Sequence, residues 1–172
     1  MDYVLPILRE SMVWIPLYVF LILFAYLNYS IKGLYWIGFA ILTIVVSNYI
    51  SSNIIKPWYN LPRPCVDAYI PNPCRLLLNR CPGHGSFTSS HATNHFALAT
   101  LVYYTLRKVA NWPKWLYLWA ASISYAQVYV GVHYPLDVLC GALLGYTVGY
   151  IGQLLYHLFI GTLHTIKSSS IT

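Results

Sequence analysis

Charged side chains are scarce in this sequence of 172 residues. Asp, Glu, Lys and Arg make up 8% of it and hydrophobic residues 58%, whereas a soluble domain carries roughly 25% charged residues. So few polar groups cannot cover a folded domain with a wetted surface, which excludes an ordinary soluble protein. The composition predicts instead a single domain, residues 1–172, that folds as an all-α helical bundle in a membrane. The 17 Tyr and 6 Trp suit anchoring at the membrane interface.

Acidic residues are the rarest charged type. Ten Lys and Arg stand against four acids, which are Asp2, Glu10, Asp67 and Asp137. Because Mg²⁺ prefers carboxylate oxygens, this shortage argues against a metal mechanism, and we expect no metal and no cofactor. The net charge of +6 favours an anionic partner. The basic residues are scattered among apolar runs and form no solvated stripe, which argues against nucleic acid as that partner.

Long charge-free runs predict about five membrane-spanning helices, because backbone groups in lipid must find partners within their own segment. The runs are Met12–Tyr29, Gly33–Ile55, Ala92–Leu106, Trp115–Val132 and Val138–Ile166. Residues 1–10 are expected to form a short interfacial helix. No small-x-small cleavage pattern follows the first run, so we expect that run to remain as an anchor. Residues 56–91 form a long loop between the second and third spans.

Two patterns with a spacing of four indicate how the spans pack. They are the polar series Ser47, Asn48, Ser51 and Ser52, and the glycine series Gly141, Gly145 and Gly149. Residues four apart share one face of a helix. The polar face is expected to point into the bundle, and the glycine face to let another helix approach closely.

The connections between spans alternate between the two membrane faces. Arg9, Lys56, Arg63, Arg75 and Arg80 fall on the face of the long loop, and Lys32, Arg107, Lys108, Lys114 and Lys167 on the other. Each face carries five basic residues, so the positive-inside rule alone does not orient the protein. If the basic residues of the loop bind an anionic ligand, they should be left out of the comparison between the two faces. The face with Lys32, Arg107, Lys108, Lys114 and Lys167 is then the cytoplasmic one, and the loop is extracytoplasmic. We expect an integral protein of the bacterial inner membrane with its site on the extracytoplasmic face.

Three cysteines share the long loop. In an extracytoplasmic loop we expect one disulfide, either Cys65–Cys81 or Cys74–Cys81, and the spacing does not choose between them. A zinc site formed by these three cysteines and His84 is the weaker alternative, because the spacing matches no common site.

The strongest polar clusters follow or precede spans on the same membrane face. They are "KPWYNLPRP" (56–64), "GSFTSSHATNHF" (85–96) and "GVHYPLDV" (131–138). In the last, Pro135 suits the first position of a helix, which places Asp137 near the third position. A carboxylate there can hold one nitrogen of His133 and leave the other free as a nucleophile. The alternative is that Asp137 only caps its helix.

The other two clusters supply groups that suit a phosphate. Lys56 offers a point charge and Arg63 a bidentate fork, although lipid-headgroup snorkelling is the alternative for a single Lys. Ser89 and Ser90 precede a helix whose free N–H groups can bind an anion. His91 at this position could protonate a departing oxygen, unless it is only an interfacial histidine. This inventory favours phosphoryl transfer through a phosphohistidine.

The order of these motifs resembles the type 2 phosphatidic acid phosphatase (PAP2) superfamily. The motifs Lys56-x6-Arg63-Pro64, "TSSH" (88–91) and His133-x3-Asp137 stand where the family has KxxxxxxRP, PSGH and SRxxxxxHxxxD. The resemblance covers about residues 47–150 and implies a metal-independent membrane phosphatase acting on lipid phosphates or pyrophosphates.

The resemblance also implies a role for each matching residue. His133 would be the nucleophile, Asp137 its orienting partner, and His91 the acid for the leaving group. The phosphoryl oxygens would be held by Lys56, Arg63, Ser89 and the backbone of Ser90.

The sequence departs from the family pattern at one charged position. Gln127 stands where the family has a phosphate-binding arginine, so that one cation is missing. Thr88 and Ser90, which replace a proline and a glycine, are milder changes. We hypothesise that a loop arginine, Arg75 or Arg80, compensates, with Arg80 the preferred candidate.

The predicted activity is hydrolysis of a lipid phosphate. The expected substrates are undecaprenyl pyrophosphate or a glycerophospholipid phosphate, such as phosphatidic acid or phosphatidylglycerol phosphate. One alternative is a lipid A phosphatase or a lipid phosphotransferase on the same scaffold. Another is a lipid-phosphate binding or transport protein that lost catalysis with the arginine.

Overall fold

The computed structural model describes residues 1–69, 75–83 and 85–163. Every regular element in these residues is helical, as the composition predicted. In chain order the elements are α1 (Val4–Leu8), η1 (Ser11–Trp14), α2 (Ile15–Tyr49), η2 (Ile50–Ile55), α3 (Lys56–Tyr59), α4 (Ser90–Leu106), η3 (Trp112–Lys114), α5 (Trp115–Tyr129) and α6 (Pro135–Phe159). Here η1 and η3 are 3₁₀ turns and η2 is a π-helical segment.

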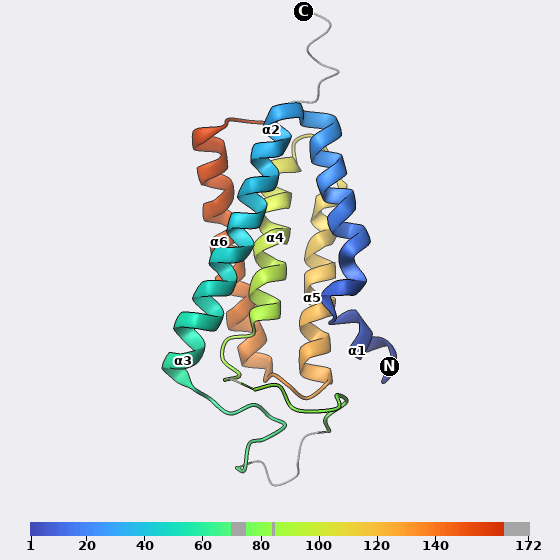
Figure 1. Cartoon of the computed structure of the whole chain (residues 1–172), viewed down its shortest axis with the longest axis vertical. Helices are drawn as coiled ribbons and strands as arrows, with labels where there is room; N and C mark the ends of the chain where they lie inside the picture. The colour runs from blue at the N-terminus through green and yellow to red at the C-terminus, as the bar shows by residue number, and fades with distance from the viewer. Residues whose placement is uncertain (70–74, 84, 164–172) are drawn as a thin grey trace, which may run out of the picture.

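The long α2 is a helical hairpin. Ser30 has a φ of 52° and a ψ of −130°, which are not helical, and the chain reverses its direction there (Figure 1). The two arms correspond to the two runs predicted on either side of residues 28–33. They can lie close together because Gly33 has no side chain, and a Cβ there would overlap the carbonyl oxygen of Ala25.

Helix α4 lies at the centre of the bundle, in contact with α2, α5 and α6 (Figure 1). Its most extensive contact is with α6, along the predicted glycine series. A Cβ on Gly145 would overlap the carbonyl oxygen of Thr93, and one on Gly149 that of Ala97. The glycines therefore let the two backbones approach closely, as the spacing predicted.

The ends of two helices differ from the predicted spans. Helix α5 ends at Tyr129 rather than Val132, and α6 ends at Phe159 rather than Ile166. The chain leaves α6 through Gly161, whose φ of +87° suits a residue without a side chain. Residues 164–166 of the predicted fifth span, like Lys167, lie outside the described residues.

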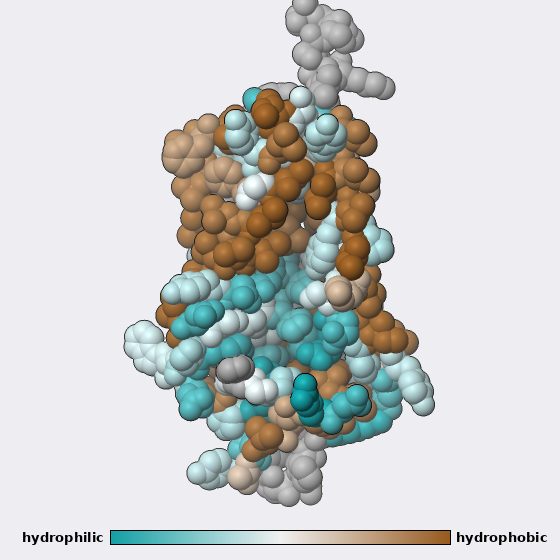
Figure 2. Space-filling view, in the orientation of Figure 1, coloured by the Kyte–Doolittle hydropathy of each residue, from teal (hydrophilic) through white to brown (hydrophobic). Residues whose placement is uncertain are grey.

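Apolar side chains cover most of the bundle, and hydrophilic side chains gather at the end where the loops lie (Figure 2). The stretches Ser11–Tyr59 and Pro135–Phe159 are long and apolar enough to cross a membrane. A bundle whose exposed face is this apolar is an integral membrane protein. Helices α4 and α5 have 17 and 15 residues, fewer than the roughly 20 that usually span a bilayer, so the count of five spans stays a prediction.

Candidate active site

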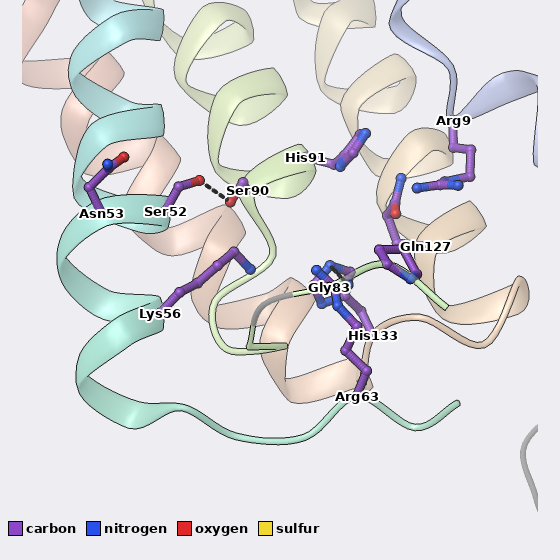
Figure 3. A pocket seen from close by; sticks show the side chains of 11 residues that line it. Arg9, Ser52, Asn53, Lys56, Arg63, Gly83, Ser90, His91, Gln127 and His133 are labelled. Carbon is purple, nitrogen blue, oxygen red and sulfur yellow. Dashed lines mark hydrogen bonds between the residues drawn. The ribbon is translucent and has the colours of Figure 1, made fainter. Parts of the chain in front are cut away.

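A cavity of about 410 Å³ opens at the loop end of the bundle. Its lining comes from all three predicted motifs and from the N-terminal segment (Figure 3). The lining residues are Arg9, Ser52, Asn53, Lys56, Arg63, Pro82, Gly83, Ser90, His91, Gln127 and His133. The two histidines of separate motifs, His91 and His133, thus face one space.

His133 lies in the turn between α5 and α6, and Asp137 is the third residue of α6. The Asp137 carboxylate accepts a hydrogen bond from the backbone N–H of Tyr134 (2.9 Å) and lies 3.4 Å from His133 Nδ1. Pro135 occupies the first turn of the helix, as predicted. Both side chains are buried, with exposed fractions of 3% and 4%. Asp137 therefore sits behind the imidazole and orients it toward the cavity.

The other ring nitrogen of His133 faces Arg63. Arg63 Nη1 lies 3.1 Å from His133 Nε2 and donates to the carbonyl oxygen of Val132 at 3.0 Å. Because a guanidinium only donates, Nε2 accepts and carries the lone pair, and Nδ1 carries the proton directed at Asp137. Burial lowers the pKa of His133 to about 4, although the hydrogen bond that Nδ1 donates to Asp137 opposes this shift. The imidazole is therefore neutral and its Nε2 is a potential nucleophile.

Lys56 opens α3, directly after the π-helical segment η2, and is 7% exposed. Its ammonium donates to three carbonyl oxygens, those of Gly85 (3.1 Å), Ser86 (3.3 Å) and Thr88 (2.6 Å). An ammonium has three N–H groups, so these carbonyls use all of them. Lys56 fixes the loop that leads into α4 while its positive charge lines the cavity.

The start of α4 places the predicted residues at different depths. Ser89 is fully buried, and its hydroxyl caps the helix by accepting from the N–H of Ala92 at 3.5 Å, so it does not line the cavity. Ser90 and His91 do line it. The ring of His91 stacks on that of His95, with centroids 6.2 Å apart. His95 Nδ1 donates to the carbonyl oxygen of His91 at 2.7 Å.

The polar series of the second span packs against this start of α4. Ser51 and Ser52 hydroxyls lie 2.9 Å and 2.8 Å from the hydroxyl of Ser90, and Ser47 donates to Asn94 at 2.8 Å. The predicted inward face is therefore present. Ser52 and its neighbour Asn53 also line the cavity, at the polar end of the second span that leads to Lys56, although neither was predicted as a site residue.

The structure does not bring the predicted loop arginines into the cavity. Arg75 pairs with Asp2 at the surface, where the Arg75 side chain is 69% exposed. Arg80 lines a neighbouring cavity. Gln127 occupies the predicted position in the cavity wall. The cation near it is Arg9 (Figure 3), and the only sequence signal for Arg9 was its place on the same membrane face as the loop.

The loop is closed by a disulfide between Cys65 and Cys81, whose Cα atoms lie 6.0 Å apart. This is one of the two predicted pairings, while Cys74 and His84 lie outside the described residues. The disulfide removes two of the four ligands of the alternative zinc site. Among residues 1–69, 75–83 and 85–163, no three His, Cys, Asp or Glu side chains gather as a metal-binding group.

Known proteins share the sequence and the fold. The chain is 29% identical over 158 residues to a lipid A 4'-phosphatase of Bacteroides thetaiotaomicron, covering 90% of this chain and 68% of that protein. It is 31% identical over 145 residues to an undecaprenyl-diphosphatase of Sulfolobus acidocaldarius, covering 81% and 61%. The chain thus spans about two thirds of the length of these curated relatives.

A solved structure has the same architecture. The crystal structure of Aquifex aeolicus LpxE superimposes with a TM-score of 0.63 and 29% identity, over 88% of this chain and 84% of that one. The pattern of the PAP2 superfamily matches residues 36–160, which include every predicted catalytic residue. The chain therefore belongs to the PAP2 superfamily.

Proposed function

We propose that the protein is a metal-independent lipid phosphatase that works through a phosphohistidine. The observation that carries the proposal is the contact of 3.1 Å between Arg63 Nη1 and His133 Nε2, with Asp137 on the opposite side of the ring. It supports an imidazole that is neutral and correctly oriented, beside a guanidinium that can bind a phosphoryl oxygen.

In the first step, a phosphoryl group enters the cavity and its oxygens take over the donors of Arg63. His133 Nε2 then attacks the terminal phosphorus and an N–P bond forms. The bond from that phosphorus to the leaving oxygen breaks, and this oxygen belongs to the lipid alcohol in a phosphomonoester and to the lipid monophosphate in a pyrophosphate. The bound anionic phosphoryl group favours protonation of His91, and His91 then gives this proton to the leaving oxygen. Asp137 stabilises the positive charge on the imidazole, and most of the catalytic effect comes from positioning and from fixed charges.

In the second step, water attacks the phosphohistidine. His91, now neutral, removes a proton from the water, the new P–O bond forms and the N–P bond breaks. Inorganic phosphate leaves, and both histidines return to their starting protonation states. The balance requires no oxidant, reductant or further substrate.

The substrate class follows from the position of the cavity. It opens at the end of an apolar bundle, where a lipid headgroup would lie while its chains stay in the bilayer. The likeness to a lipid A 4'-phosphatase favours a glycolipid phosphomonoester, and the likeness to an undecaprenyl-diphosphatase favours a prenyl pyrophosphate. The cavity's cations suit either group.

The proposed placement is in a bacterial inner membrane with five spans and the cavity outside the cytoplasm. The disulfide Cys65–Cys81 supports this orientation, because disulfides persist in oxidising compartments.

The test is release of inorganic phosphate by purified protein in detergent, measured with a panel of lipid phosphates. The panel contains lipid A, undecaprenyl pyrophosphate, phosphatidic acid and phosphatidylglycerol phosphate. We expect turnover that persists in EDTA and falls at least about 10³-fold in His133→Ala. A chemically quenched reaction with labelled substrate should trap an acid-labile phosphoprotein, and His91→Ala should slow its formation.

Several results would count against the proposal. A strict requirement for Mg²⁺ would overturn the mechanism. Phosphate appearing on a second lipid instead of in solution would indicate a phosphotransferase. Tight binding of the lipid phosphates with no phosphate release would indicate a binding or transport protein.

A further inference from the structure

Gln127 is a buried amide without partners in the wall of the cavity. The residue has no exposed surface, and neither its Oε1 nor its Nε2 has a hydrogen-bond partner among the described residues. An unpaired buried amide destabilises the folded protein, because its polar atoms have lost their hydrogen bonds to water. A group that enters the cavity and accepts a hydrogen bond from Nε2 would reduce that destabilisation.

Arg9 supplies a positive charge to the same cavity. Its side chain is 11% exposed, and its one ion pair among the described residues is a long contact of 3.6 Å to the exposed Glu10. The buried Nε has no hydrogen-bond partner, and burial lowers the pKa of the guanidinium. Arg9 therefore has donors to offer an anion.

The segment that carries Arg9 is held against the bundle. Tyr129 of α5 donates to the carboxylate of Asp2 at 2.9 Å, and Trp14 donates to the carbonyl oxygen of Leu8 at 2.8 Å. Leu5 on α1 is buried. These contacts fix both ends of the short helix, so Arg9 is positioned rather than free to sample solvent.

The charges in the cavity are unbalanced in favour of an anion. After burial, the positive charge of Arg9 is the next cause that lowers the pKa of Arg63, so the two guanidinium groups repel each other across the cavity. Among the described residues, two carboxylates lie near these arginines. Asp137 is engaged by His133 and the backbone of Tyr134, and Glu10, which makes the long contact to Arg9, is mostly exposed to solvent. A doubly charged phosphoryl group between the two arginines would relieve this repulsion.

We propose that Arg9 replaces the arginine that the family has at position 127, and that it binds a phosphoryl oxygen together with the amide of Gln127. The inference rests on the proposed lipid phosphatase activity and adds a residue to its site. Residue 9 lies outside the region that matches the family, residues 36–160. The cation is thus supplied by a different element of the chain at the same place in the cavity.

The other arginines at this end of the bundle fit the role less well. Arg80 lines a neighbouring cavity, which shares Arg9, Pro82 and Gly83 with the main cavity, but Arg80 does not line the main cavity. Arg75 is mostly exposed and paired with Asp2. Arg9 is the arginine that shares the main cavity with Gln127 and Arg63. Figure 3 shows its side chain directed toward Gln127.

The experiment is a charge swap. Arg9→Gln should lower kcat/KM for a lipid phosphate by about 10²-fold, the scale of one lost preorganised donor. Adding Gln127→Arg to Arg9→Gln should recover at least about tenfold, because the cation returns to the same cavity. Arg107→Gln, at the opposite end of the bundle, removes an equal charge and should leave kcat/KM within about twofold. Thermal unfolding of each variant reports whether it is folded.

A second readout does not depend on turnover. Titration calorimetry with inorganic phosphate should show binding to the wild type that weakens at least about tenfold in Arg9→Gln and recovers in the double variant. If the wild type binds phosphate but hydrolyses no lipid, the proposed function fails while the role of Arg9 is still measured. The inference on Arg9 is overturned if Arg9→Gln behaves as wild type, if Arg80→Gln causes the loss instead, if Gln127→Arg rescues nothing, or if the wild type binds no phosphate.

Discussion

At the scale of single residues, two hydrogen bonds decide which nitrogen of His133 can react. Arg63 can only donate, so Nε2 must hold the lone pair, and Asp137 holds the proton on Nδ1. The reactive tautomer is therefore set before a substrate arrives. In the proposed mechanism, the same contact would block Nε2 until a phosphoryl group takes the donors of Arg63, which would couple substrate binding to activation of the nucleophile.

Lys56 matches a phosphate-binding position of the family motif but also has a structural role. The family resemblance assigns it to phosphate binding, but its three donors are used by carbonyl oxygens of residues 85–88. We infer that it acts on the substrate mainly as a fixed charge and holds the loop before α4 in place. Substitution of Lys56 would therefore alter both the electrostatic potential in the cavity and the position of His91.

The pKa of His133 predicts the acidic limit of activity. With this pKa lowered to about 4, the ring is neutral above that pH and loses its lone pair by protonation below it. We expect kcat/KM to fall on the acidic side near pH 4, rather than near the pH of about 6.5 typical of an ordinary histidine.

Asp137→Asn tests whether protonation of His133 causes the acidic limit of activity. The Asp137 hydrogen bond raises the pKa of His133 against the effect of burial, so its loss should move the acidic limb to lower pH. It should also reduce the maximum rate by roughly 10²–10⁴-fold, because the tautomer is no longer held. Both proteins are assayed on one substrate, so the substrate's own ionisation cancels. An acidic limb that moves upward would contradict the assignment.

At the scale of elements, the contact between α4 and α6 sets the geometry of the site. Helix α4 begins next to His91, and α6 begins next to His133 and carries Asp137. The glycine series keeps the two backbones close, so the distance between His91 and His133 depends on residues far along the helices. Tight packing of α4 on α6 therefore sets the positions of the two histidines.

Substitution of Gly145 tests this dependence. In Gly145→Ala the new Cβ would overlap backbone atoms of Thr93, and such overpacking typically costs about 1–3 kcal/mol. We expect a lower unfolding temperature in detergent together with a loss of activity, because α4 must move away from α6.

Gly38→Ala is the matched control, since a Cβ on this helical glycine meets nothing within 4 Å. It should leave activity unchanged and stabilise the protein slightly, because alanine favours a helix by roughly 0.5–1 kcal/mol over glycine. Equal effects of the two substitutions would mean that the α4–α6 contact does not constrain the site.

At the scale of the whole molecule, the site is assembled at the loop end of the bundle, where hydrophilic side chains gather on the face shown in Figure 2. The loop before α4 forms part of its wall and is tied by Cys65–Cys81. Arg63 lies just before the first cysteine, and Pro82 and Gly83 follow the second. The disulfide therefore joins two parts of the loop that both line the cavity.

Removal of this disulfide should destabilise the protein. A closed loop of about this length, with its cysteines 16 residues apart, contributes about 3 kcal/mol by restricting the unfolded chain. We expect Cys65→Ser/Cys81→Ser to unfold at a lower temperature and to have a higher KM, because Arg63 and Pro82 are less well placed.

Cys140→Ser is the control for loss of a sulfur atom, since Cys140 is a free, half-buried thiol. It should leave the unfolding temperature nearly unchanged. A reductant should lower the unfolding temperature of the wild type and of Cys140→Ser but have no further effect on the double variant. The same unfolding temperature in wild type and double variant would disprove the structural role of the disulfide.

Much of this protein is determined by short-range information in the sequence. Composition alone requires a membrane bundle, because so few polar side chains cannot hydrate a surface. Pro135 and Asp137 define the start of a helix, and the i, i+4 spacing then brings Asp137 to His133 without any long-range contact. The glycine series predicts a close helix contact because each missing side chain leaves space along one face.

Only the tertiary structure decides which distant residues complete the site. The sequence favoured Arg80 over Arg75 and did not single out Arg9, because the position of a long loop or of the N-terminal segment depends on contacts such as Tyr129 to Asp2. The disulfide partner of Cys81 and the three carbonyls around Lys56 were undetermined for the same reason. Local patterns fix helices and their capping residues, whereas the balance of charge in a cavity is fixed by how separate segments pack.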